Sequence, residues 1–251
     1  MTYHLLNGDA LLDRFTATKL EGQVLVAREC LIEGDVSGNS LADFWNSRAA
    51  SIESAYHESS ATYFRRVVGE FDKLLAAQDQ SDVHLWFGYD LFCQVNMWFV
   101  LSLLYNQPRT FNVFAVYPSH LNSDAIWNDF GGATVADLLS CFASKVAFSN
   151  ADIQLGNNLW NAYRQHDLVK LAELSITHSP CFPYLNEVCR AHIERFGSHG
   201  EKGRPERVVE AIISGGTTDF PAVFRAFTQR EGIYGFGDSQ LKPLYDNVMA
   251  R

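Results

Sequence analysis

Short apolar runs alternate with longer segments of helical periodicity along the first half of the chain. The apolar runs cover residues 3–6, 24–27, 84–87 and 111–116. Each run ends at polar residues, glycine or proline, which is typical of a strand end. Strands separated by helix-length segments favour parallel pairing with right-handed crossovers. The pattern therefore predicts an α/β fold with a small parallel Rossmann-like sheet flanked by helices.

The segments between these runs carry the helical signal. Residues 41–77 have apolar positions at helical spacing and a break near residues 57–60, so we expect two helices there. Residues 90–106 predict an apolar helix. After Pro118 the strand signal fades. We expect a helical cover packed over the sheet, formed by residues 134–148, 150–163, 168–174 and 184–196.

The C-terminal part has a different pattern. A polar, glycine-containing segment at residues 197–203 precedes two predicted helices, a short predicted strand at residues 233–236, and a final predicted helix. This order is the outline of a winged-helix-like module. We therefore expect two parts, which are an α/β domain with its helical cover over residues 1–195 and a small winged-helix-like C-terminal module over residues 196–251.

Composition excludes several protein classes. The chain has 251 residues, of which 47% are hydrophobic and 20% are charged, so it can bury a sizeable core and is neither disordered nor collagen-like. Its formal net charge is −9, and Lys and Arg balance Asp and Glu in the C-terminal module. A nucleic-acid reader usually concentrates basic residues on one face. Nucleic-acid binding is therefore not the favoured reading.

Targeting signals and cysteine usage indicate the compartment. The N-terminus has no basic region followed by a long apolar stretch, and residues 91–105 are too short to span a bilayer. The five cysteines are widely spaced and odd in number, which favours reduced thiols over a disulfide framework. We therefore expect a cytoplasmic protein without a membrane segment. The sequence is compatible with a monomer or an oligomer.

Several segments resemble one bacterial family. They are residues 4–11 (HLLNGDAL), 28–34 (RECLIEG), 44–49 (FWNSRA), 85–94 (LWFGYDLFCQ) and 191–196 (AHIERF). In this order they resemble the uncharacterised family catalogued as domain of unknown function 1835, and residues 234–238 (YGFGD) resemble its usual helical C-terminal module. One departure is Asp35, which stands where the family pattern has proline. The resemblance implies an architecture and no established activity.

Polar residues follow three of the predicted strands, where ligands bind in open parallel sheets. Asn7, Gly8 and Asp9 follow the first strand, Arg28, Glu29 and Glu33 the second, and Asp90 and Gln94 the third. We expect these groups to converge. Asp9, Glu29 and Asp90 are the candidate catalytic residues, and Asn7, Gly8, Arg28, Glu33 and Gln94 are the candidate ligand-binding residues.

Two chemistries suit this set. The carboxylates of Asp9, Glu29, Glu33 and Asp90 could hold a divalent cation such as Mg²⁺, while Arg28 could clamp a phosphate or carboxylate. Structural roles explain the same residues. Asp9 and Asp90 each stand where a helix begins and could cap it, Arg28 could form an ion pair, and Gln94 could satisfy a buried backbone group.

Two functions from different classes follow. The first is a small-molecule pocket for a phosphorylated or nucleotide-like ligand at the strand ends, with metal-assisted hydrolysis or group transfer as the chemistry. The alternative is a non-enzymatic regulator that binds DNA or a protein partner through the winged-helix-like module. Convergence of the strand-end residues in one cleft would favour the first function.

Overall fold

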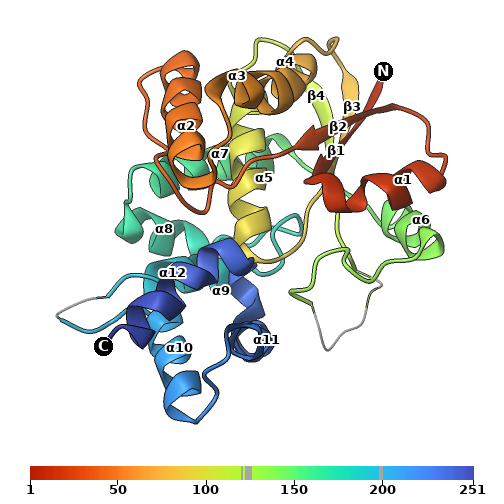
Figure 1. The fold of residues 1–251 in the computed structure, drawn as a ribbon. Coiled ribbons are helices and arrows are strands. Elements are labelled where there is room, and N and C mark those ends of the chain that lie inside the picture. The colour runs from red at the N-terminus through yellow and green to blue at the C-terminus, as the bar shows by residue number, and fades with distance from the viewer. Residues whose placement is uncertain (120, 122–125, 198–199) are drawn as a thin grey trace.

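A five-stranded, mostly parallel sheet lies at the centre of the molecule (Figure 1). The computed structural model describes residues 1–119, 121, 126–197 and 200–251. The strand order is β2-β1-β3-β4-β5, in which β5 alone is antiparallel to its neighbour. The strands are β1 (Thr2–Asn7), β2 (Gln23–Ala27), β3 (Ser81–Trp86), β4 (Phe111–Val116) and β5 (Val146–Ala147). The predicted α/β class and the four predicted parallel strands are confirmed.

Helices cover both faces of the sheet (Figure 1). On one face lie η1 (Asp9–Leu11), α1 (Leu12–Ala17) and α6 (Val135–Ala143). On the other face lie α2 (Leu41–Tyr56), α3 (Ser60–Tyr63), the π-helical turn η2 (Phe64–Val68), α4 (Gly69–Leu75) and α5 (Leu91–Tyr105). The break expected near residues 57–60 is confirmed, because His57 ends α2 in the left-handed conformation and Ser59 caps α3.

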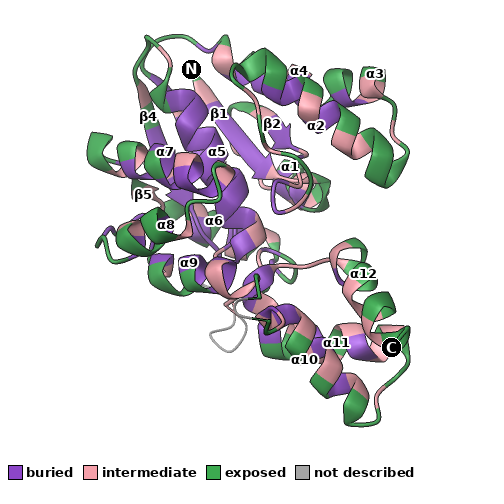
Figure 2. Ribbon diagram, turned by 90° about the vertical axis from the view of Figure 1, so that its left-hand side faces the viewer, coloured by how far each residue is buried: buried purple, intermediate pink, exposed green. Residues whose placement is uncertain are grey.

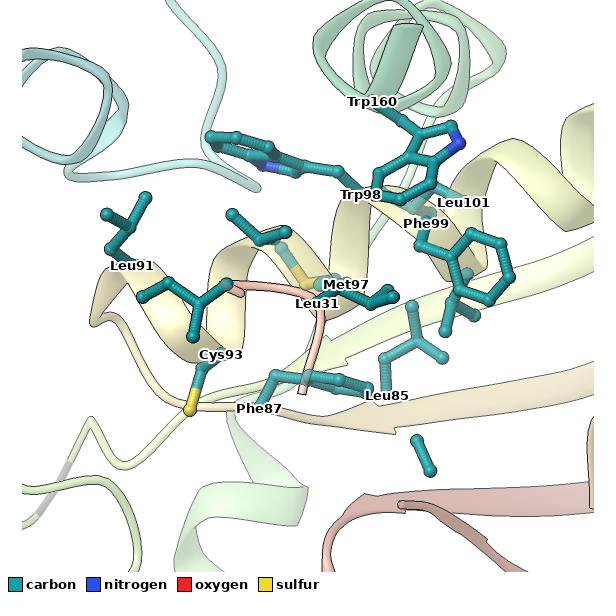
Figure 3. Close-up of a cluster of buried hydrophobic side chains, with 14 of the residues drawn as sticks. Leu31, Leu85, Phe87, Leu91, Cys93, Met97, Trp98, Phe99, Leu101 and Trp160 are labelled. Carbon is teal, nitrogen blue, oxygen red and sulfur yellow. The ribbon is translucent and has the colours of Figure 1, made fainter. Parts of the chain in front are cut away.

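Two hydrophobic cores follow from this layering. The smaller core packs Leu6, Trp86 and Val116 of the sheet against Phe15 of α1 and Leu138 of α6. The larger core lies on the other face and is centred on α5, which is buried along almost its whole length (Figures 2 and 3). A helix that is apolar on every side needs partners all round, and this explains why a further layer of helices covers α5.

That further layer consists of α7 (Asn150–Arg164), α8 (Leu168–Ser175) and α9 (Leu185–Glu194). The C-terminal part follows as α10 (Arg204–Ser214), α11 (Phe220–Glu231), the short 3-10 turn η4 (Gly232–Tyr234) and α12 (Asp238–Met249). The helices α10, α11 and α12 pack on one another, and η4 contacts α9 and α5. We call residues 204–249 the C-terminal helical group.

Three sequence-based expectations about elements are corrected. The predicted strand at residues 233–236 is wrong, since these residues form η4 and the loop that follows it. Within residues 200–251 the structure has no strand, so the expected wing is not present and a winged-helix fold is not confirmed. The predicted helix at residues 134–148 ends at Ala143, and β5 follows it as an edge strand on β4. In the part of the chain that is described, no helix is both long and apolar enough to cross a membrane.

Candidate functional site

The strand order creates a crevice at the carboxyl ends of β1 and β3. The chain leaves β1 towards the face that carries α1, and it leaves β3 towards the opposite face, which carries α5. Adjacent strands whose connections diverge in this way leave a gap beyond their ends, and ligands of open α/β sheets bind there. Asn7 is the last residue of β1, and Asp90 precedes α5 in the connection after β3.

A cavity of about 440 Å³ occupies this crevice. Three parts of the chain enclose it, namely the strand ends with the start of α5, the loop before α6, and the C-terminal helical group. Its described lining is Asn7, Asp90, Phe92, Cys93, Trp127, Asn128, Asp129, Gly131, Gly132, Phe227, Thr228, Glu231, Gly232, Gly235 and Phe236. We call it the switch-point cavity.

Asp90 caps α5 and packs against the C-terminal helical group. It caps α5, because its Oδ1 accepts a hydrogen bond from the Cys93 amide at 3.0 Å. Gly235 of the C-terminal helical group presses against the same carboxylate, since a Cβ at this glycine would lie 2.0 Å from Asp90 Oδ1. Asp90 is only 2% exposed. Burial raises the pKa of its carboxyl, although the amide hydrogen bond opposes the shift.

Asp129 brings a second carboxylate to Asp90. A Cβ at Gly88 would lie 2.9 Å from both Asp129 Oδ1 and Asp90 Oδ2, so these oxygens are at most twice that distance apart. Asp129 Oδ1 is shielded from solvent and has no hydrogen-bond partner among the described residues. Burial, with a further contribution from the Asp90 charge, raises the pKa of Asp129 to about 7. The two carboxyl groups form a pair that gains or loses a proton near neutral pH.

Amide and thiol groups order the floor of the cavity. Asn7 donates from Nδ2 to Cys93 Sγ at 3.1 Å and accepts at Oδ1 from Asn96 Nδ2 at 2.9 Å. Asn96 also donates to the Glu29 carbonyl at 2.8 Å, which connects the ends of β1 and β2 to α5. Burial and the nearby aspartates raise the pKa of the Cys93 thiol. Cys93 is therefore a neutral thiol here and not a nucleophilic thiolate.

The walls of the cavity are aromatic and acidic. Phe92, Trp127 and Phe236 supply apolar surface, and Glu231 adds a third carboxylate that pairs with Arg204 at 2.8 Å. No Lys or Arg is among the described lining residues. The cavity therefore suits a neutral or cationic ligand better than an anionic one.

The predicted strand-end residues do not converge in one cleft. Asn7 and Asp90 line the switch-point cavity, whereas Gly8, Asp9 and Arg28 line a second cavity beside β2. Asp9 is bound by Arg28, whose Nε and Nη2 donate to its carboxylate at 2.8–3.0 Å. Strand order explains the separation, because β2 and β3 lie on opposite sides of β1, and the second cavity is closed on the β2 side by α2, α3 and η2.

Glu29 has a structural environment. Its carboxylate accepts hydrogen bonds from Arg48 Nε and Nη2 at 3.2 and 2.9 Å, and from the Tyr63 hydroxyl. Both members of the Arg48–Glu29 pair have side chains that are 1% exposed. Glu29 lines neither cavity. Its position does not support the catalytic role expected from the sequence.

Glu33 and Gln94 also have partners of their own. Glu33 accepts hydrogen bonds from the Tyr56 hydroxyl and from Gln240 Nε2, the latter at 2.8 Å, so it ties α2 to α12. Gln94 is 5% exposed and donates from Nε2 to the Gly88 carbonyl at 2.8 Å. It therefore satisfies a buried backbone group, which is the structural role that the sequence offers as the alternative to ligand binding. Gln94 thus fixes the loop that leads to Asp90, and Glu33 joins the loop after β2 to the C-terminal helical group.

The four-carboxylate cation site expected from the sequence does not form, because Asp9, Glu29, Glu33 and Asp90 lie in separate surroundings. Across the described residues, no three His, Cys, Asp or Glu side chains are placed to hold a metal ion. Asp90 and Asp129 offer two carboxylates, so a Mg²⁺ ion here would need water or ligand oxygens to complete its coordination. Two buried carboxyl groups with raised pKa values can also donate and accept protons.

Sequence reasoning missed Asp129, which lies in a loop far along the chain from any predicted strand end. The one available signal is the run of residues 128–132 (NDFGG), whose polar and glycine residues indicate a tight loop. Asp129 adopts a positive φ of 45°, a conformation that Asp and Asn tolerate better than most residues. This turn directs the carboxylate towards Gly88.

Comparison of the chain with models of known families, with curated proteins and with solved structures finds no match. The resemblance to the domain of unknown function 1835 stays a prediction, and the function has to be argued from the switch-point cavity itself.

Proposed function

We propose that this protein is an acid–base enzyme that acts on a small, neutral, hydroxylated ligand bound in the switch-point cavity. The reaction class is hydrolysis or group transfer, with Asp129 as the group that donates and accepts the proton. The observation that carries the proposal is the pair of buried carboxyl groups, Asp90 and Asp129, which face each other across Gly88 at the end of β3.

The roles of the two aspartates follow from their surroundings. Asp90 is the more buried of the two and is fixed by the Cys93 amide, so it serves as the stationary charge. Asp129 is partly accessible, and its pKa of about 7 leaves both protonation states populated near neutral pH. A group with this pKa is well matched to general acid and general base catalysis.

The ligand class follows from the lining. Trp127 and Phe236 can contact the face of a sugar ring or a base, while Asn128 and Thr228 can hydrogen-bond hydroxyl groups. A phosphate group inside this cavity would meet the carboxyl groups of Asp90 and Asp129 and no Lys or Arg in the described lining. Of the phosphorylated or nucleotide-like ligand expected from the sequence, the nucleoside part therefore suits this cavity and the phosphate does not.

The test is a panel of nucleosides and simple glycosides, compared with the matching monophosphates. Binding is followed by ligand-observed NMR, and product formation by chromatography, between pH 5 and 9. We expect a neutral member of the panel to bind, and to be cleaved or transferred with a pH dependence centred near 7. In Asp129→Asn, turnover should fall by about 10²- to 10⁴-fold, which is typical for loss of a general acid or base.

Asp13→Asn is the matched control, because Asp13 is an exposed aspartate on α1 whose side chain has no hydrogen bond or ion pair with another described residue. Its turnover should equal that of the parent protein. Equal turnover in Asp129→Asn and the parent protein across the pH range would contradict the proposal. So would a panel in which only the monophosphates bind.

A further inference from the structure

A second cavity lies at the carboxyl ends of β1 and β2. Its volume is about 330 Å³, and it is separated from the switch-point cavity by the loop that follows Asn7. Its described lining is Gly8, Asp9, Arg28, Cys30, Ile52, Tyr56, Glu58, Tyr63, Arg66 and Val67. Two of these residues are arginines, whereas the switch-point cavity has none in its described lining.

The two arginines differ in what they bind. Arg28 is fully engaged, since it donates to Asp9 and, from Nη1, to the Arg66 carbonyl at 3.0 Å. The Arg66 side chain makes no hydrogen bond to the residues that the structure describes. Its nearest acidic oxygens are on Asp9 at 3.7 Å and on Glu58 at 4.0 Å. The half-exposed Arg66 guanidinium is thus ion-paired with both carboxylates, and none of the described residues accepts a hydrogen bond from it.

The backbone around Arg66 and Gly8 is unusual in a way that shapes this cavity. Arg66 lies in the π-helical turn η2, and turns of this kind are often found at functional sites. Its carbonyl is held by Arg28, which fixes the turn against the end of β2. Gly8 has a φ of +88°, and a Cβ there would meet nothing within 4 Å. The floor of the cavity is therefore open backbone next to Arg28 and Arg66.

From these observations we infer that the cavity is a second ligand site, which binds the phosphate group of a small phosphomonoester through Arg66. The phosphate oxygens would accept from the free guanidinium donors, a contact for which arginine is well suited. Ile52, Val67 and Tyr63 would contact the organic part of the ester. This site is independent of the acid–base function proposed for the switch-point cavity.

Asp9 sets a limit on how this ligand binds. Its carboxylate already occupies the Arg28 fork, and hydrogen bonding from Arg28 lowers its pKa, so it is charged at neutral pH. A bound phosphate therefore approaches Arg66 from the side away from Asp9, and the Asp9 carboxylate repels it. Removing the Asp9 charge should tighten phosphate binding.

The probes are inorganic phosphate and phenyl phosphate, titrated into the full-length chain by isothermal calorimetry at low ionic strength. We expect phenyl phosphate to bind more tightly than inorganic phosphate. Arg66→Gln should weaken binding by about tenfold or more, which is the value of one charge-assisted contact. Arg65→Gln is the matched control, because Arg65 is the neighbouring exposed arginine on η2 and does not line the cavity.

The variants distinguish a specific phosphate site from an effect of general surface charge. A loss in Arg66→Gln with little change in Arg65→Gln, together with tighter binding in Asp9→Asn, supports the site. Equal losses of affinity in Arg65→Gln and Arg66→Gln would mean that the probes respond to general surface charge, and this would overturn the inference. Failure of both probes to bind would overturn it as well. Asp129→Asn should leave phosphate binding unchanged. A negative result for the phosphate site can therefore be distinguished from a negative result for the acid–base function.

Discussion

Asp9 and Asp90 both follow a strand of the sheet, and their surroundings give their carboxyl groups opposite properties. Asp9 is half exposed and bound by Arg28, which lowers its pKa. Asp90 is buried with no ion pair to any described residue, and its pKa is raised. The sequence predicts that both aspartates lie near strand ends. It does not predict which of them meets an arginine and which meets a second aspartate, because both partners come from distant segments.

Glu29 illustrates the same limit, because its partner Arg48 lies on α2, and the sequence does not predict which side chain of that helix meets the end of β2. In Glu29→Gln, the Arg48 guanidinium would remain buried without its counter-charge. We expect a loss of about 3–5 kcal/mol in the free energy of unfolding. The measurement is urea denaturation followed by circular dichroism.

Glu187→Gln is the control for this prediction, since Glu187 is exposed on α9 and has no hydrogen bond or ion pair within the described structure. Its unfolding free energy should stay within about 0.5 kcal/mol of the parent value. An equally small effect in Glu29→Gln would mean that the buried pair is not coupled to folding.

At the scale of elements, the packing of α5 against α7 depends on one glycine. A Cβ at Gly156 of α7 would lie 2.4 Å from Leu101 Cδ1 and 2.8 Å from Leu101 Cβ on α5. Leu101 and the neighbouring Trp160 belong to the core that surrounds α5 (Figure 3). The two helices approach closely because Gly156 has no side chain.

Gly156→Ala should therefore destabilise the protein by about 1–3 kcal/mol through overpacking, although alanine is the better helix former. Gly69→Ala is the matched control. Gly69 begins α4, and a Cβ there would meet only the Phe64 carbonyl oxygen at 3.7 Å, so this change should be neutral or slightly stabilising. Thermal unfolding of the two variants checks both expectations, and a reversed order of stability would contradict the packing argument.

The strands show how far elements are predictable. The four parallel strands are predicted to within a few residues because each is a distinct apolar run. The edge strand β5 is missed because it has only two residues, and only its pairing with β4 makes it a strand. Similarly, residues 233–236 have the apolar character of a strand, but Gly235 at a φ of +62° ends a 3-10 turn there. Tertiary contacts decide both cases.

At the scale of the whole molecule, buried histidines make the fold sensitive to acid. Burial lowers the pKa of His84 in the sheet to about 4 and that of His192 in α9 to about 3. Both imidazoles are neutral in the folded protein and take up protons when it unfolds. The contribution of these histidines to stability is therefore complete above pH 6.5 and is lost as the pH drops from 6.5 towards their folded-state pKa values. The raised pKa of Asp129 acts in the opposite direction, because its folded-state carboxyl binds a proton more readily than the unfolded one.

We expect the two histidines to lower the free energy of unfolding by on the order of 2 kcal/mol or more between pH 6.5 and 4.5, against the opposing contribution of Asp129. The measurement compares urea midpoints at several pH values in the parent protein and in His192→Leu, which removes an imidazole whose two ring nitrogens lack hydrogen-bond partners in the described structure. On acidification the midpoint should fall less, or rise more, in His192→Leu than in the parent protein, whereas the control His178→Gln changes an exposed histidine and should match the parent. The same pH dependence in His192→Leu and the parent protein would contradict the prediction.

The contact between Gly235 and Asp90 has a consequence for how the molecule is assembled. During synthesis Asp90 emerges early, and Gly235 follows only after more than half the chain length has been added. Until then the side of the Asp90 carboxyl that Gly235 contacts is uncovered. Docking of the C-terminal helical group adds to the burial that raises its pKa. The nascent chain can therefore fold its sheet first and acquire its reactive carboxyl pair last.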